Sequence, residues 1–420
     1  MRTCRLLSCA AGAMLLSLSA KAADWPGWRG PQRNAVSTET GLLKEWPKPG
    51  PRLVWQAKDI GDGYASPSVA GNRVYILGNH GLDNEFVAAL STADGKLVWS
   101  VRLGKVGNPE QMPSFPTARS TPTVDGGLLY ALGSDGDLAC LETSSGKLRW
   151  RKSLRSDFGG VPGKFAYTES PLVDGDALIV TPGGALATIV ALNKRTGETL
   201  WKSAVPGGDD AAYASAIVVE AAGRRQYVQF LAKGLVGVDA NTGQFLWRYD
   251  GTGKGDINMS TPVASGGYIY TWQNRGPSGL IRLAAAGQGV AAEQIYFLRG
   301  LLNSIGGSVV VGATHYGATN DGLMAADWVT GKLLWHEAAT GGGAILQAEN
   351  RLYIHAEDGS VILVEATPEA YREKGRFMPP GRPARTREAA EKAWAYPAVA
   401  NGRLYVRELT SLWCYDVAAR

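Results

Sequence analysis

The stretch ALSTADGKLVW at residues 89–99 decides the fold, because its pattern returns four more times along the chain. Each copy starts with a small residue, has a glycine six positions later and a tryptophan four positions after that glycine. The further copies are CLETSSGKLRW at 140–150, ALNKRTGETLW at 191–201, GVDANTGQFLW at 237–247 and AADWVTGKLLW at 325–335. A fixed spacing at such intervals indicates a repeat protein whose units stack on their neighbours.

A second motif, Ser/Thr-Pro followed by an apolar strand and a glycine-containing turn, alternates with the first. It stands at Ser66-Pro67, Thr121-Pro122, Ser170-Pro171 and Thr261-Pro262, and degenerate copies bring the total to eight units. Turns such as Asp94-Gly95 between alternating apolar runs predict hairpins, so each unit predicts four strands. Eight four-stranded units predict an all-β, eight-bladed β-propeller of antiparallel blades over residues 50–420.

The two ends of this region complete one blade. Residues 51–55 predict an outer strand without a preceding partner, and residues 412–416 predict a strand without a following one. Pairing them closes the ring and removes the free sheet edges that favour aggregation.

The repeated tryptophans have a structural interpretation and a functional one. Identical spacing favours rings that lie flat against the neighbouring blade over rings that stack on a ligand. The predicted structural tryptophans are Trp55, Trp99, Trp150, Trp201, Trp247 and Trp335. Cys140 and Cys414 occupy the small-residue position of the motif, which predicts buried structural thiols; a disulfide or a reactive site is the alternative.

Residues 1–22 predict a cleavable export signal: two arginines, a short apolar run and Ala20-Lys21-Ala22. The apolar run is too short to span a membrane, and no other run predicts a transmembrane segment. The net charge of the whole chain is +5, and it falls to +2 without the signal. A near-neutral surface argues against a nucleic-acid partner. We therefore expect a periplasmic or secreted monomer with a leader over residues 23–49.

The repeat resembles that of the pyrroloquinoline-quinone (PQQ) repeat propellers. This group includes the quinoprotein alcohol dehydrogenases and the non-catalytic barrel-assembly propeller lipoprotein. The leader sequence DWPGWRGP at residues 24–31 resembles the opening of secreted PQQ-like propellers of unassigned role. The resemblance implies the fold, whereas function depends on the site.

In the dehydrogenases of this group, PQQ and calcium bind in the central funnel. Residues just before each innermost strand are expected to line the funnel mouth here, and these candidate ligand-binding residues are Tyr64, Arg119, Glu169, Tyr213, Asn258, Asn303 and Trp394. By counting blades, the resemblance implies that Glu169 and Asn258 are counterparts of the calcium ligands. Asn303 falls where the dehydrogenases have a catalytic Asp, and an amide cannot serve as a general base. Their adjacent cysteine pair is absent from this sequence, so no catalytic residue is assigned.

These features favour an exported, non-catalytic scaffold that presents its funnel and loops to a protein or a small ligand. A PQQ-dependent dehydrogenase acting on alcohols or sugars is one alternative, with PQQ and calcium as its cofactors. A glycan-binding propeller is another, suggested by aromatics expected to be exposed at Trp25, Trp28 and Trp394. Residues 366–393 are interpreted as an insertion between blades seven and eight, either a solvated connection or a lid.

Overall fold

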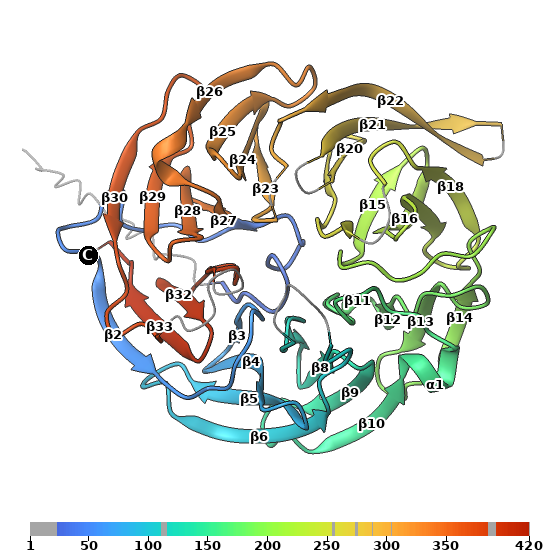
Figure 1. The fold of residues 1–420 in the computed structure, drawn as a ribbon, viewed down its shortest axis with the longest axis horizontal. Helices are drawn as coiled ribbons and strands as arrows, with labels where there is room; N and C mark the ends of the chain where they lie inside the picture. Colours follow the sequence, from blue (N-terminus) through green and yellow to red (C-terminus); the bar gives the residue numbers. More distant parts are fainter. Residues whose placement is uncertain are drawn as a thin grey trace, which may run out of the picture.

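The computed structural model is a ring of eight β-sheets around a central axis (Figure 1). It describes residues 23–110, 116–253, 257–273, 276–287, 289–303, 305–384 and 392–419. The predicted export signal and the stretch 385–391 lie outside these residues. Neighbouring strands within each blade are antiparallel, as the hairpin turns predict. The expectation of an eight-bladed, all-β propeller is therefore confirmed.

The first four blades run in chain order from the innermost to the outermost strand. Blade one is β3 (Ser68–Ala70), β4 (Arg73–His80), β5 (Asn84–Ser91) and β6 (Leu97–Gly104). Blade two is β7 (Thr123–Asp125), β8 (Leu128–Leu132), β9 (Asp137–Glu142) and β10 (Leu148–Ser153), followed by α1 (Leu154–Phe158). Blade three is β11 (Leu172–Asp174), β12 (Ala177–Val180), β13 (Ile189–Asn193) and β14 (Thr199–Ser203). Blade four is β15 (Ile217–Ala221), β16 (Arg224–Phe230), β17 (Leu235–Asp239) and β18 (Phe245–Tyr249).

The remaining blades follow the same plan. Blade five is β19 (Val263–Ser265), β20 (Tyr268–Trp272), β21 (Pro277–Ala286) and β22 (Gly289–Arg299). Blade six is β23 (Ser308–Val311), β24 (Thr314–Thr319), β25 (Gly322–Asp327) and β26 (Leu333–Glu337), followed by η2 (Ala338–Thr340). Blade seven is β27 (Gly343–Ala348), β28 (Arg351–Ala356), β29 (Val361–Glu365) and β30 (Glu373–Phe377). Blade eight is β31 (Ala398–Ala400), β32 (Arg403–Glu408), β33 (Ser411–Asp416) and β2 (Arg52–Ala57).

Blade eight joins the two ends of the chain. Strand β2 pairs antiparallel with β33, and Trp55 lies opposite Cys414. Arg52 and Asp416 form an ion pair of 2.7 Å at the start of this pairing. The outer strand of the last blade thus comes from the beginning of the propeller sequence, which confirms the predicted ring closure.

The tryptophan of one blade packs on the glycine turn of the next. The indole Nε1 of Trp99 in blade one donates to the carbonyl of Thr143 in blade two at 3.0 Å. A Cβ placed on Gly146 in that turn would lie 2.8 Å from the Trp99 ring, and the φ of Gly146 is +71°. Both the close approach and the positive φ require glycine. A register shift at the tryptophan of each such outer strand, a β-bulge, twists the strand toward its neighbour.

The same indole hydrogen bond recurs at three other junctions and changes at one. The glycine turn recurs with it at Gly95 beneath Trp55 and at Gly197 beneath Trp150, whereas the turn that Trp335 meets has no glycine. Trp55 and Trp150 donate to carbonyls in the next blade at 2.8 and 3.1 Å, and Trp335 donates to Thr367 at 2.9 Å. Trp247 instead donates to Gln226 of its own blade at 2.6 Å. The reason is that blade five replaces the glycine turn with the long β21–β22 hairpin, so no such turn faces Trp247. This hairpin reaches out beyond the ring in Figure 1.

The leader, residues 23–49, crosses the middle of the ring (dark blue in Figure 1). The inner edge of each innermost strand carries backbone groups that need hydrogen-bond partners. Trp25 pairs with Val69 of β3 through two backbone hydrogen bonds of 2.8 Å. The carbonyl of Pro26 accepts from Val124 of β7 at 2.7 Å. The leader therefore occupies the inner edges of blades one and two.

Two buried arginines and a tryptophan extend these contacts around the axis. Arg33 donates to the carbonyls of Ser170, Pro171 and Ala216, each at 2.6 Å, and so bridges blades three and four. Trp28 donates to Thr261 before β19 at 2.8 Å, and Arg29 donates to Ser308 of β23 at 2.5 Å, which reaches blades five and six.

The last part of the leader reaches blades seven and eight. Strand β1 (Val36–Ser37) adds to β27 in parallel, so that sheet has five strands. The Glu39 carboxylate accepts from the backbone amides of Asn401 and Gly402 in the turn between β31 and β32. Since Leu42 also pairs with Ala418, the leader contacts all eight blades.

Two expectations from the sequence are wrong. Trp25 was expected to be exposed, but only 3% of it is exposed because its ring packs on Gly30 within the leader. Trp25 therefore no longer supports the glycan-binding alternative. Residues 366–393 are also not wholly an insertion, since β30 within them is the outer strand of blade seven. Cys140 and Cys414 are buried free thiols; burial raises the pKa of Cys140 to about 11 and that of Cys414 to about 12.

Replacing Trp99 with alanine should lower the free energy of unfolding by about 3–5 kcal/mol, because it removes a buried ring from a packed junction. Chemical denaturation followed by circular dichroism measures this loss. Leu97→Ala in the same strand is the control, since Leu97 is 62% exposed and should change stability by about 0.5 kcal/mol at most. Equal effects of the two substitutions would show that the tryptophan is not a packing residue.

Replacing Arg33 with alanine should destabilise the ring by at least about 3 kcal/mol, because three buried carbonyls in blades three and four lose their donor. The midpoint of denaturation and limited proteolysis of the leader report this change. Gln32→Ala, at an exposed neighbouring position, should leave both unchanged. If Arg33→Ala unfolds at the same midpoint as the parent, the leader does not hold these blades together.

Candidate binding site at the mouth of the channel

The seven predicted site residues lie at one end of the channel. Each stands a few residues before an innermost strand: β3, β7, β11, β15, β19, β23 or β31. We call this end the mouth face. The opposite end, which carries the β3–β4 type of turn and the turns before the outermost strands, is the turn face.

Four of these residues and one further aromatic form a continuous arc, which we call the mouth arc: Trp394, Tyr64, Arg119, Phe165 and Tyr213. The rings of Trp394 and Tyr64 have centroids 5.1 Å apart, and the guanidinium of Arg119 lies 5.5 Å from the Tyr64 centroid. Arg119 is also 5.9 Å from the Phe165 centroid, and Phe165 is 5.4 Å from Tyr213. The arc therefore links the connections that precede blades eight, one, two, three and four.

Phe165 is the member that the sequence did not identify. It lies in a connection without a repeat register, and its position beside Arg119 depends on how that connection folds. Lys164 next to it is exposed, with its ammonium 5.8 Å from the Phe165 ring. Burial lowers the pKa of Arg119, and the nearby Tyr64 and Tyr213 phenols oppose this shift. The arc is thus an aromatic wall with cationic groups on it.

The acidic and amide candidates are bonded to the protein itself. One carboxylate oxygen of Glu169 accepts from the Thr181 backbone amide, and the other accepts from Gln229 at 3.2 Å. Gln229 also donates to the Ala214 carbonyl at 3.1 Å. Glu169 therefore joins blades three and four, the same pair that Arg33 bridges from the leader.

The side chains of the two candidate asparagines also donate hydrogen bonds to backbone carbonyls of the protein. The Asn258 amide nitrogen donates to the carbonyls of Leu231 and Ala232 at 2.7 and 2.9 Å, and that of Asn303 donates to Gly276 at 2.9 Å. Asn258 is fully buried, and Tyr64, Glu169, Tyr213 and Asn303 are 3–8% exposed. These side chains pack into the mouth and do not line an open funnel.

This donor set does not match a PQQ-calcium site. Calcium prefers several ionised carboxylate or carbonyl oxygens around one point, whereas burial raises the pKa of Glu169 to about 7, which favours its neutral form. Among the described residues, no cluster of three or more His, Cys, Asp or Glu side chains could hold a metal ion. The leader also fills the opposite end of the same channel.

Glu85 in β5 is a second buried carboxyl that the sequence did not identify. One of its oxygens accepts from the backbone amide and the hydroxyl of Ser134 at 2.8 and 2.6 Å. The other oxygen is buried and has no hydrogen-bond partner in the described part of the chain. Burial raises the pKa of Glu85 to about 7, and the nearby Asp137 and Asp135 add to this shift.

The repeat, the ring and the tryptophan junctions together define the class of PQQ-like repeat β-propellers. The chain belongs to the PQQ_2 family, described as outer membrane protein assembly factor BamB, which matches residues 83–316.

Two curated relatives show the range of this similarity. The outer membrane protein assembly factor BamB of Salmonella typhimurium is 28% identical over 141 residues, which are 33% of this chain and 31% of that protein. Tetrathionate hydrolase of Acidithiobacillus ferrooxidans is 24% identical over 325 residues, which are 64% of this chain and 58% of that protein. The matches thus span from about a third to somewhat over half of these relatives' own length.

Solved structures share the fold. BamB from Moraxella catarrhalis superposes with a TM-score of 0.59 at 17% identity, covering 87% of this chain and 97% of that one. Quinohemoprotein alcohol dehydrogenase ADHIIG from Pseudomonas putida HK5 gives a TM-score of 0.66 at 14% identity, covering 94% and 80%. Since scaffolds and enzymes share this architecture, the fold does not choose between them.

Glu85 should make the free energy of unfolding fall as the pH rises. Its pKa is about 7 in the folded protein and ordinarily 4.5, so the folded state binds the proton more tightly. This contribution is complete below pH 4.5 and is lost as the pH rises through 7, on the order of 3 kcal/mol in all. In Glu85→Gln, stability relative to the parent should therefore increase by that amount between pH 4.5 and pH 8. Urea denaturation at both pH values measures it.

The matched control is Glu198→Gln, because Glu198 is exposed. Its stability difference from the parent should be the same at both pH values. A Glu85→Gln difference that does not change with pH would show that folding does not raise the pKa of Glu85.

Proposed function

We propose that this chain is an exported, non-catalytic scaffold that binds a protein partner through its mouth face. The observation that carries the proposal is the occupation of the channel by the chain itself. The leader, with Arg33, fills it from the turn face, and the mouth arc packs across the other end. A partner would therefore bind the outer surface around the mouth, where the exposed Lys164 and the partly exposed Trp394 lie.

The family supports a protein as the partner. The matching family and the Salmonella relative carry the description of an outer-membrane protein assembly factor, which is a protein-binding role. We propose the same class of partner here, a component of outer-membrane protein assembly, with the chain exported to the periplasm by residues 1–22. No helix among the described residues has the length and apolar character needed to cross a membrane.

The mouth face is also chemically suited to a protein. Aromatic side chains and arginine are the residues enriched at the energetic centres of protein interfaces. The mouth arc supplies both on a rigid ring, and Lys164 adds a cation at its exposed rim. A partner with an acidic or aromatic loop matches this surface.

Site-specific photocrosslinking in the envelope of the native host tests the proposal. A benzophenone side chain at position 164, on the mouth face, should give one product of defined size that contains an assembly component. The same group at exposed position 147, in the β9–β10 turn on the turn face, is the control and should not give that product. Phe165→Ala should weaken the crosslink from position 164.

Two results would contradict the proposal. The first is the same products from both positions, or none from position 164. The second is sustained oxidation of alcohols or sugars by the purified chain with PQQ and calcium, lost in Glu169→Ala, which would establish the dehydrogenase alternative.

A further inference from the structure

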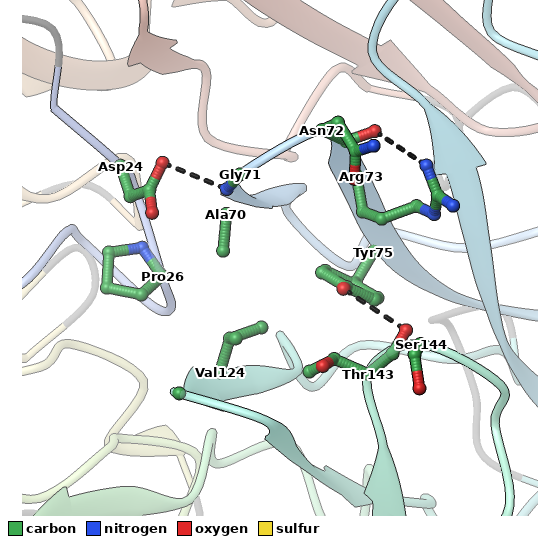
Figure 2. Close-up of a pocket in the computed structure, with 11 residues that line it drawn as sticks. Asp24, Pro26, Ala70, Gly71, Asn72, Arg73, Tyr75, Val124, Thr143 and Ser144 are labelled. Carbon is green, nitrogen blue, oxygen red and sulfur yellow. Dashed lines mark hydrogen bonds between the residues drawn. The ribbon is translucent and has the colours of Figure 1, made fainter.

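A separate cavity lies on the turn face between blades one and two (Figure 2). Its volume is about 400 Å³, within the range of sites that hold small molecules. Four segments build it: the start of the leader, the β3–β4 hairpin, the β7–β8 turn and the β9–β10 turn. The residues that line it include Asp24, Pro26, Arg73, Tyr75, Thr143 and Ser144.

Two opposite charges stand on different walls of this cavity. Asp24 comes from the leader and accepts from the backbone amide of Gly71 at 3.1 Å and from Asn401 at 3.3 Å. Arg73 comes from β4 and donates to the Asn72 carbonyl at 3.1 Å. In the described part of the chain, neither side chain forms an ion pair with the other or with a third residue. Arg73 Nε is also buried without a hydrogen-bond partner there.

Both charges influence the Tyr75 phenol, which also lines the cavity. In Figure 2 the Tyr75 ring lies below Arg73, and Asp24 lies to the left of both. Burial raises the pKa of Tyr75, the Arg73 charge opposes this shift and the Asp24 charge adds to it. Among the described residues, the hydrogen bond that the Tyr75 hydroxyl donates is a long one of 3.4 Å, to the Thr143 carbonyl.

The remaining walls are of two kinds. Pro26, Ala70 and Val124 supply apolar lining from three segments, and Thr143 and Ser144 supply hydroxyls from the β9–β10 turn. No side-chain hydrogen bond within the described residues occupies either hydroxyl. The cavity thus combines one anion, one cation, a small apolar surface and free hydroxyls.

From this arrangement we propose that the cavity between blades one and two binds a small zwitterion that carries a primary ammonium and a carboxylate, an amino acid or a dipeptide. The ammonium pairs with Asp24 and the carboxylate pairs with Arg73, because charge-assisted hydrogen bonds are the strong ones. A simple anion would be repelled by the Asp24 carboxylate, and a simple cation would be repelled by the Arg73 guanidinium. A small side chain rests on Pro26, Ala70 and Val124. The site is independent of the mouth face.

Titration calorimetry of the purified chain with four ligands tests each charge separately. L-alanine and L-alanyl-L-alanine carry both charges, and whichever of them binds more tightly identifies the length of the ligand. N-acetyl-L-alanine lacks the ammonium, and L-alaninamide lacks the carboxylate. Each of these two should bind at least about tenfold more weakly, the effect of losing one hydrogen bond to a charged group.

Two variants test whether Asp24 binds the ammonium of the ligand and Arg73 binds its carboxylate. Asp24→Asn should weaken L-alanine about tenfold and leave N-acetyl-L-alanine unchanged. Arg73→Gln should weaken L-alanine similarly and leave L-alaninamide unchanged. Arg52→Gln is the control, since Arg52 is an exposed arginine paired with Asp416 elsewhere on the ring, and it should bind as the parent does. Ser144→Tyr, which adds a bulky ring at an exposed lining position, should abolish binding without lowering the melting temperature.

The proposal is overturned if neither zwitterion gives saturable heat. It is overturned equally if the two single-charge ligands bind as tightly as L-alanine, or if Asp24→Asn and Arg73→Gln bind as the parent does. Tight binding of an uncharged sugar with no dependence on these two residues would assign the cavity to another ligand class.

Discussion

The inner edges of the eight blades carry backbone groups that face the channel axis, and the structure depends on how these groups are satisfied. The leader satisfies them with a backbone bridge at Val69, a parallel strand at β27 and the guanidiniums of Arg29 and Arg33. Burial lowers the pKa of Arg33 to about 9, which leaves it charged at neutral pH. Three carbonyl dipoles stabilise that buried charge, so the arginine and the blades that it joins depend on each other.

The junctions between blades follow from a different constraint on the outside of the ring. Where an indole ring lies directly over the tip of a neighbouring turn, as Trp99 does at Gly146, that position has no room for a Cβ. Blade five lacks such a turn, and the consequences appear on both of its sides. Trp247 turns back to Gln226, and Gly331 of blade six is covered by Tyr296 and Leu298 of β22. Where blade five departs from the repeat, other side chains therefore pack at the junctions with its neighbours.

The leader crosses the channel of this ring and bonds to the inner edges of its blades. A channel that holds a cofactor needs ligands with lone pairs directed at one point. Here the candidate ligands Glu169 and Asn258 are bonded to backbone and side-chain groups of adjacent blades. The mouth face and the cavity beside Asp24 both keep charged and aromatic groups near the surface. They lie at opposite ends of the ring, so a partner at one leaves the other accessible.

The sequence by itself determined the blade number, the closing of the ring by its two ends and the outward tryptophans, because these depend on spacings within about 50 residues that repeat. It placed Tyr64, Arg119 and Trp394 at one end for the same reason. Only the tertiary structure decided what fills the channel and what surrounds each charge. The leader's contacts join residues up to 377 positions apart, and contacts of that kind occur once, without a period. Phe165 and Glu85 were missed for the same reason: neither belongs to a repeated position, and the burial that gives each its role comes from a neighbouring blade.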